Sequence, residues 1–118
     1  MKKTILIGVT GGIAAFKTLE LVASLAKKNF DVRVIMTESA CAIVAPEKFE
    51  KASGNPVYLH LFDAAFDYKT ILDRRTVDHI ELANKASLFV IVPATANVIA
   101  KLACGIADDY LTTTALAA

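Results

Sequence analysis

The chain has 118 residues and a net charge of +1, and 55% of its residues are hydrophobic and 21% charged. This length and composition predict one domain with a real core, and they differ from the composition of disordered proteins. The near-neutral charge gives no basic surface for nucleic acid, and the longest apolar run, residues 86–96, is well short of the roughly 20 residues of a membrane span. The N-terminus lacks a signal-peptide pattern, so we expect a cytoplasmic protein whose partners include neither nucleic acid nor a membrane.

Strand and helix patterns alternate through the first half of the chain. Residues 4–9 form a β-branched run typical of a strand, and apolar residues then recur from 15 to 26 on one face of an amphipathic helix. A second strand is predicted over 31–36. A helical segment starts at 40–45, is interrupted by Pro46, and then resumes until a Gly-Asn-Pro turn closes it.

The second half of the chain begins with a segment of uncertain structure. Residues 57–76 are expected to be mostly irregular, with an edge strand at their start as the alternative. The Asp-x-x-Glu spacing at residues 78–81 is a capping box, which predicts a helix over 79–86. The apolar run 88–92 is typical of a strand covered on both faces.

The C-terminal residues predict two further helices. The first follows the turn 93–97 and ends at Gly105, and the second is expected to be capped by Asp108. The pattern is still helical at Ala118, so we expect residues 1–118 to be a single domain that is incomplete at its C-terminus. The whole order predicts an open, mostly parallel α/β sheet with helices on both faces.

Candidate ligand groups follow three of the predicted strands. They are residues 10–12, 37–39 and 95–97. Each set places hydroxyl or amide side chains and free backbone N–H groups at a strand-to-helix turn, where the helix dipole favours an anion. Thr10, Ser39 and Thr95 could also be ordinary N-caps, but their position at one edge of the same sheet favours a shared phosphate-bearing ligand.

Two nucleotide-binding signatures are approached but not matched. The stretch GGIAAFKT at residues 11–18 has Phe16 where a triphosphate loop requires glycine, so we expect Phe16 to pack in the first helix and Lys17 to be solvated. Likewise, the glycines do not form the dinucleotide fingerprint, although Glu38 after the second strand leaves an adenosine ribose site open. An NAD-binding module therefore stays as a weaker alternative.

The titratable and sulfur-containing side chains give one catalytic candidate. His79 falls in the first turn of a predicted helix, where the dipole favours neutral imidazole that can accept a proton; the alternative is a surface histidine. His60 is expected to be structural. Cys41 and Cys104 have no metal-ligand spacing, so we predict two small buried thiols and no metal site.

Five motifs in chain order resemble those of the homo-oligomeric flavin-containing cysteine decarboxylases. They lie at residues 7–15, 36–40, 79–83, 93–97 and 105–113. The resemblance covers the chain except for about residues 57–76, and it is strongest to the branch that acts on phosphopantothenoylcysteine in coenzyme A biosynthesis. It implies a Rossmann-like, flavodoxin-like domain that binds FMN, assembles as a homotrimer or homododecamer, and takes a small-molecule cysteinyl substrate.

The same resemblance implies the reaction and its residues. The reaction is the FMN-dependent oxidative decarboxylation of 4'-phospho-N-pantothenoylcysteine to 4'-phosphopantetheine, with His79 assisting proton removal from the thiol. Val98 replaces the threonine usual in the fourth motif, and the family's substrate-carboxylate motif and flap cysteine would lie beyond residue 118. The cofactor-binding residues carried over are Thr10, Gly11, Gly12, Ile13, Thr37, Ser39, Thr95, Ala96 and Asn97.

Other functions remain open at this point. A related flavoprotein, either a peptidyl-cysteine decarboxylase or a flavin prenyltransferase, is one alternative, and a non-catalytic flavin-binding or regulatory subunit is another. Flavin prenyltransferases carry a lysine within the stretch that matches residues 95–98, which is absent here, so they are disfavoured.

Overall fold

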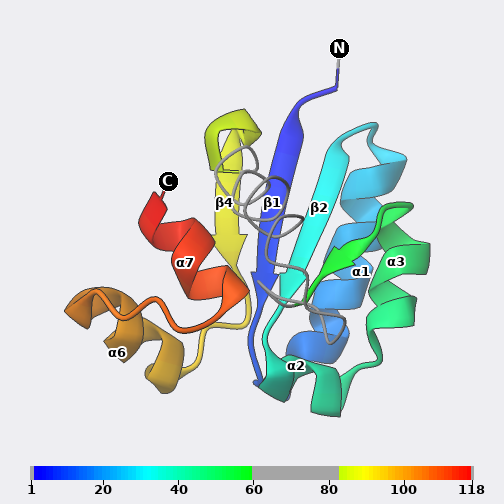
Figure 1. Ribbon diagram of the computed structural model, residues 1–118. Helices are drawn as coiled ribbons and strands as arrows, with labels where there is room; N and C mark the ends of the chain where they lie inside the picture. Colours follow the sequence, from blue (N-terminus) through cyan, green and yellow to red (C-terminus); the bar gives the residue numbers. More distant parts are fainter. Residues whose placement is uncertain (1, 60–82, 118) are drawn as a thin grey trace, which may run out of the picture.

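A parallel sheet with strand order β3-β2-β1-β4 forms the centre of the protein. The computed structural model describes residues 2–59 and 83–117. The strands point in the same direction, so their carboxyl ends lie at one edge (Figure 1). They are β1 (Thr4–Val9), β2 (Asp31–Met36), β3 (Val57–Tyr58) and β4 (Leu88–Ile91). The predicted open α/β sheet is confirmed.

Helices cover both faces of this sheet, as predicted (Figure 1). The helices on one face are α1 (Ala15–Lys27), α2 (Glu38–Ile43) and α3 (Pro46–Ser53), and those on the other are α6 (Ala96–Cys104) and α7 (Tyr110–Ala117). None of the helices within the described ranges is long and apolar enough to cross a membrane.

Strand β1 is the most buried element, because it packs against helices on both sides. Ile5, Ile7 and Val9 join the cluster formed with α1, α2 and α3, whereas Leu6 joins the cluster formed with α6 and α7. All six residues of β1 are buried. Each fully buried aliphatic side chain of this kind contributes about 1.5–3 kcal/mol to stability.

The described elements differ from the sequence expectation in two places. Val57 and Tyr58 form a short parallel strand beside β2, in a region expected to be mostly irregular. Pro46 does not merely interrupt a helix but starts a new one, since proline is favoured at the first helical position. Of the helix predicted over 79–86, residues 83–85 are described as helical, and His79 lies outside the described residues.

Phe16 does not lie on the buried face of α1, although it was expected to pack in this helix. Ala15, Thr18 and Val22 are its buried residues. Phe16 is 54% exposed, so the expectation that it packs in this helix is wrong. Phe16 is one residue, or about 100°, away from the buried stripe, which explains its exposure. Lys17 is exposed, as expected.

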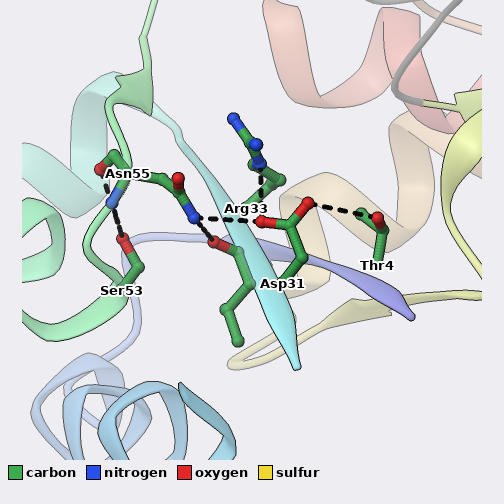
Figure 2. Close-up of polar contacts among 6 residues, drawn as sticks. Thr4, Asp31, Arg33, Ser53 and Asn55 are labelled. Atoms are coloured by element: carbon green, nitrogen blue, oxygen red, sulfur yellow. Dashed lines mark hydrogen bonds and ion pairs between the residues drawn. The ribbon is translucent and has the colours of Figure 1, made fainter. Parts of the chain in front are cut away.

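A polar cluster ties the amino ends of β1 and β2 to the end of α3 (Figure 2). The Asp31 carboxylate accepts hydrogen bonds from Arg33 Nε (3.0 Å), Asn55 Nδ2 (3.2 Å) and Thr4 Oγ1 (3.3 Å). Asn55 Nδ2 also donates to the Val32 carbonyl at 2.8 Å. Burial tends to raise the pKa of Asp31, but the hydrogen bond and charge of Arg33 and the hydrogen bond from Thr4 outweigh it, so this pKa is lowered.

An Asp31→Asn variant is expected to lose about 1–2 kcal/mol of stability at neutral pH, since charge-assisted hydrogen bonds are replaced by weaker ones. A carboxyl whose pKa is lower in the folded state stabilises the fold above its unfolded pKa of about 3.9, and this contribution disappears as pH falls through the folded value. Urea unfolding measures the free energy of unfolding at pH 7 and at pH 3. This free energy should fall less between the two pH values in the variant than in the unaltered protein. Glu50→Gln, on an exposed face of α3, is the control; equal acid sensitivity of Asp31→Asn and the unaltered protein would contradict the assignment.

Candidate functional site at the carboxyl ends of the strands

The three predicted strand ends converge on one cavity of about 550 Å³. This volume is typical of sites for small organic ligands. The residues that line it from these turns are Thr10, Gly11, Thr37, Glu38, Ser39, Thr95 and Asn97. The remaining lining residues are Leu59, Val98, Lys101, Asp108, Asp109 and Tyr110. The expectation that residues from separate turns lie together is therefore met by six of the nine predicted cofactor residues.

Thr10 joins the turn after β1 to the turn after β4. Its hydroxyl donates to the Pro93 carbonyl and accepts from the Thr95 backbone N–H at 3.2 Å. Thr10 is fully buried and does not cap a helix, because α1 begins after Ala14 without a side-chain cap. Since the hydroxyl hydrogen is already used, Thr10 holds the two turns together rather than offering this hydrogen to a ligand.

Gly11 allows the turns after β1 and β2 to approach each other closely. A Cβ atom placed on Gly11 would lie 2.4 Å from Ser39 Cβ and 3.2 Å from the Ser39 carbonyl carbon. Gly12 has a similar but weaker constraint, with a Cβ 3.0 Å from Pro93 Cγ. In the described part of the chain, neither Gly11 nor Gly12 is among the residues with positive φ. The close contacts of an added Cβ, and not the backbone conformation, therefore explain the glycines at these positions.

Threonine hydroxyls cap the helices that start at the cavity. Thr37 Oγ1 accepts from the Ala40 N–H at 3.2 Å, and Thr95 Oγ1 accepts from the Val98 N–H at 3.3 Å. The N-cap interpretation is thus correct for Thr95, but for α2 the cap is Thr37 and not Ser39. Capping uses a lone pair and leaves the hydroxyl hydrogen as a donor. Ser39 is exposed in the first turn of α2.

Three of the predicted cofactor residues are absent from the cavity lining. Gly12, Ile13 and Ala96 belong to the same turns but do not line the cavity, and Ile13 is 87% exposed. His79 lies outside the described residues. Val98 lines the cavity and is also buried, at 4% exposure, in the cluster with α7, an environment that suits an apolar side chain where a threonine is usual.

The connection between α6 and α7 brings charges to the cavity. Lys101 Nζ lies 2.9 Å from the carboxylate of Asp108, and this hydrogen-bonded pair raises the pKa of Lys101. The cap of α7 is Asp109, whose carboxylate accepts from the Thr112 N–H and hydroxyl, both at 2.7 Å. The expectation that Asp108 caps this helix is therefore wrong, because Asp108 is paired with Lys101 instead.

The charge of the cavity lining is mostly negative. Among the described residues that line it, Lys101 is the only cation, and it is already paired, whereas Glu38, Asp108 and Asp109 are acidic. A bound anion would thus be held mainly by backbone N–H and hydroxyl groups at the strand ends, as in many phosphate sites. Sequence reasoning did not assign Lys101 or Tyr110 to the site, although the seven-residue spacing from Lys101 to Asp108 across Gly105 was a usable signal.

The two thiols differ in environment. Cys41 is partly buried in α2, and burial together with the neighbouring charges of Glu38 and Glu47 raises the pKa of its thiol. Cys104 is exposed at the end of α6, so the prediction of a buried thiol is wrong there. Over residues 2–59 and 83–117, no group of three or more His, Cys, Asp or Glu side chains is placed to hold a metal ion.

The chain resembles known proteins along its whole length. A family model described as Flavoprotein matches residues 1–118. The coenzyme A biosynthesis bifunctional protein CoaBC of Bacillus subtilis (strain 168) is 45% identical over 116 residues, covering 98% of this chain and 27% of that protein. CoaBC of Escherichia coli (strain K12) is 44% identical over 115 residues, with coverages of 98% and 27%. The chain thus spans about a quarter of the length of these relatives.

A solved structure shares the fold. The FMN-dependent cysteine decarboxylase SpaF superposes with a TM-score of 0.79 at 32% identity, over 98% of this chain and 63% of that one. This chain therefore aligns with more than half of that decarboxylase chain.

Proposed function

The chain belongs to the Flavoprotein family, and we propose that it binds FMN at the carboxyl edge of the sheet and uses it to decarboxylate a cysteinyl substrate. The observation that carries this proposal is the convergence of three strand ends on one cavity. In open parallel sheets this edge is where ligands bind, and each turn supplies N–H or hydroxyl donors suited to a phosphate.

The residues at the cavity fit the phosphate of FMN. Gly11 lacks a side chain at the closest approach of two turns, so backbone N–H groups can reach a ligand there. The hydroxyls of Thr37 and Ser39 are donors from α2, and Thr95 and Asn97 are donors from the turn after β4. Because the lining has little free positive charge, we assign the phosphate to these neutral donors rather than to Lys101.

Three further residues would contact the cofactor from the rim. Gly12, Ile13 and Ala96 do not line the cavity, but they adjoin residues that do. Ile13 is 87% exposed, and an exposed aliphatic side chain beside a cavity can pack against a flat aromatic ring. We propose this role for Ile13, with backbone contacts from Gly12 and Ala96.

The reaction requires that a carboxylate leave from a saturated carbon. The chemistry that FMN would supply when bound is a two-electron oxidation of the cysteinyl portion, which provides an acceptor for the electron pair left when carbon dioxide departs; the reduced cofactor would then return both electrons, so that the product is a saturated thiol. The protein must hold the substrate thiol near the cofactor and accept the thiol proton. We propose His79 as this base, since the sequence predicts it in the first turn of a helix, where a neutral imidazole can take a proton.

The substrate is best assigned from the relatives and the motifs together. The identity of 45% to a coenzyme A biosynthesis protein exceeds the 32% to SpaF. We therefore propose 4'-phospho-N-pantothenoylcysteine as substrate and 4'-phosphopantetheine as product, with a peptidyl cysteine as the alternative. A homotrimer or homododecamer and a cytoplasmic location are part of the same proposal.

FMN and riboflavin titrations of the full-length protein test the cofactor assignment. We expect the purified protein to absorb at about 370 and 450 nm, as bound oxidised flavins do. We also expect it to bind FMN at least about a hundredfold more tightly than riboflavin. Riboflavin has no phosphate, so two or more charge-assisted hydrogen bonds are lost. Equal affinity for both flavins would contradict the phosphate site. A colourless protein that does not bind added FMN would overturn the proposed function.

A further inference from the structure

Thr18 is a buried polar residue that sequence reasoning did not connect with the site. It is 2% exposed and lies between Ala15 and Val22 on the face of α1 that packs against the sheet. That face is otherwise apolar, and a hydroxyl buried there without a partner would cost about 1–3 kcal/mol. A specific hydrogen bond is therefore expected to account for a threonine at this position.

The hydroxyl of Thr18 makes that hydrogen bond with a distant segment. It donates to the Val92 carbonyl at 3.0 Å, across 74 positions of sequence. A threonine inside a helix commonly bonds its own preceding turn. Here the carbonyl of Ala14, one turn earlier, already accepts hydrogen bonds from the backbone N–H groups of Lys17 (2.9 Å) and Thr18 (3.3 Å). The Thr18 hydroxyl bonds the Val92 carbonyl instead.

Thr10 and Thr18 together hold consecutive carbonyls of the turn after β4. Thr18 binds the carbonyl of Val92, and Thr10 binds that of Pro93 and the N–H of Thr95. The backbone from Val92 to Thr95 is thus held by two side chains from the β1–α1 segment. Thr95 is in turn the N-cap of α6 and lines the cavity.

We propose that Thr18 is a positioning residue for the cofactor site, acting through the Val92 carbonyl to fix where Thr95 and Asn97 stand relative to the turns after β1 and β2. This inference rests on the proposed function, since the effect on the ligand presumes that FMN binds there. Thr18 itself does not line the cavity, and it sets the geometry of groups that do. Removal of its hydroxyl should weaken FMN binding without removing any group that touches FMN.

Thr18→Val and Thr18→Ser in the full-length protein test this inference. Valine keeps the shape of threonine but removes the hydroxyl, so we expect FMN to bind about tenfold more weakly, the equivalent of one lost hydrogen bond. Serine restores the hydroxyl and should bring the affinity to within about twofold of the unaltered protein. In the cofactor-free protein, the amide of Thr95 should exchange its hydrogen faster in Thr18→Val, because the released turn can carry the Thr95 N–H away from its acceptor, the Thr10 hydroxyl.

Thr4→Val is the matched control. Thr4, the first residue of β1, is also buried, at 3% exposure, and its hydroxyl donates to Asp31 at the end of the sheet opposite the cavity. This variant should lose stability but bind FMN with unchanged affinity at a temperature where all variants are folded. If Thr18→Val binds FMN as tightly as Thr4→Val, or if serine does not rescue, Thr18 is only a core residue and the inference fails. If the unaltered protein does not bind FMN, the proposed function fails and this inference with it.

Discussion

A Gly11→Ala variant of the full-length protein is expected to bind FMN at least about thirtyfold more weakly than the unaltered protein. The added methyl group would lie 2.4 Å from Ser39 Cβ, and atoms of the Ser39 backbone lie at 3.2 and 3.4 Å. Backbone cannot rotate away as the end of a long side chain can, so the turn after β1 must separate from the turn after β2 by about an ångström. After a displacement of this size, donors on the two turns can no longer hydrogen-bond the same FMN phosphate.

Gly8→Ala separates this effect from a general loss of packing. Its new methyl group would meet Leu111 Cδ1 at 2.8 Å and Cγ at 3.1 Å, so the neighbour is a side chain that can change rotamer. Gly8→Ala should therefore lower the free energy of unfolding by about 1–3 kcal/mol while FMN affinity changes little. Fluorescence titration with FMN and urea unfolding measure the two quantities, and a Gly11→Ala protein with unaltered FMN affinity would refute a phosphate site between these turns.

A His79→Asn variant is expected to retain FMN but to lose turnover. Removal of a positioned general base costs about 10²- to 10⁴-fold in rate, and asparagine keeps a similar size without accepting a proton from a thiol. Release of carbon dioxide from phosphopantothenoylcysteine measures the rate, and the absorption spectrum measures cofactor content. The assignment rests on the capping-box position of His79 and on the family motif at residues 79–83.

His60→Asn serves as the matched control for His79, because it removes the other histidine of the chain. We expect this variant to turn over substrate at nearly the rate of the unaltered protein. Full activity of His79→Asn with bound FMN would exclude the base role. A loss of FMN in His79→Asn would instead assign the histidine to cofactor binding.

The architecture was predictable because the signals that define it are local. The β-branched run at residues 4–9 and the apolar run at 88–92 predicted buried strands, and the left-handed Gly105 that ends α6 was identified from its place after the helical pattern. The convergence of the strand ends was predictable too, since parallel strands present their carboxyl ends at one edge.

The errors arose where distant contacts decide between equivalent local choices. Asp108 and Asp109 are both suited to start a helix, and the pairing of Asp108 with Lys101 leaves Asp109 as the cap. Similarly, Thr37 and Ser39 can each cap α2, and the sequence does not show which hydroxyl meets the helix. Phe16 follows Ala15 directly, and only the packing of α1 on the sheet determines which of the two is buried.

The cluster around Asp31 shown in Figure 2 lies at the amino ends of the strands. The cavity lies at their carboxyl ends. The six residues of β2 separate Asp31 from Thr37 by roughly 20 Å. Mutations that far apart generally have additive effects on free energy. An engineer could therefore vary the Asp31 end to raise or lower heat tolerance and vary the cavity end to change the ligand, treating the two ends as independently adjustable parts of one scaffold.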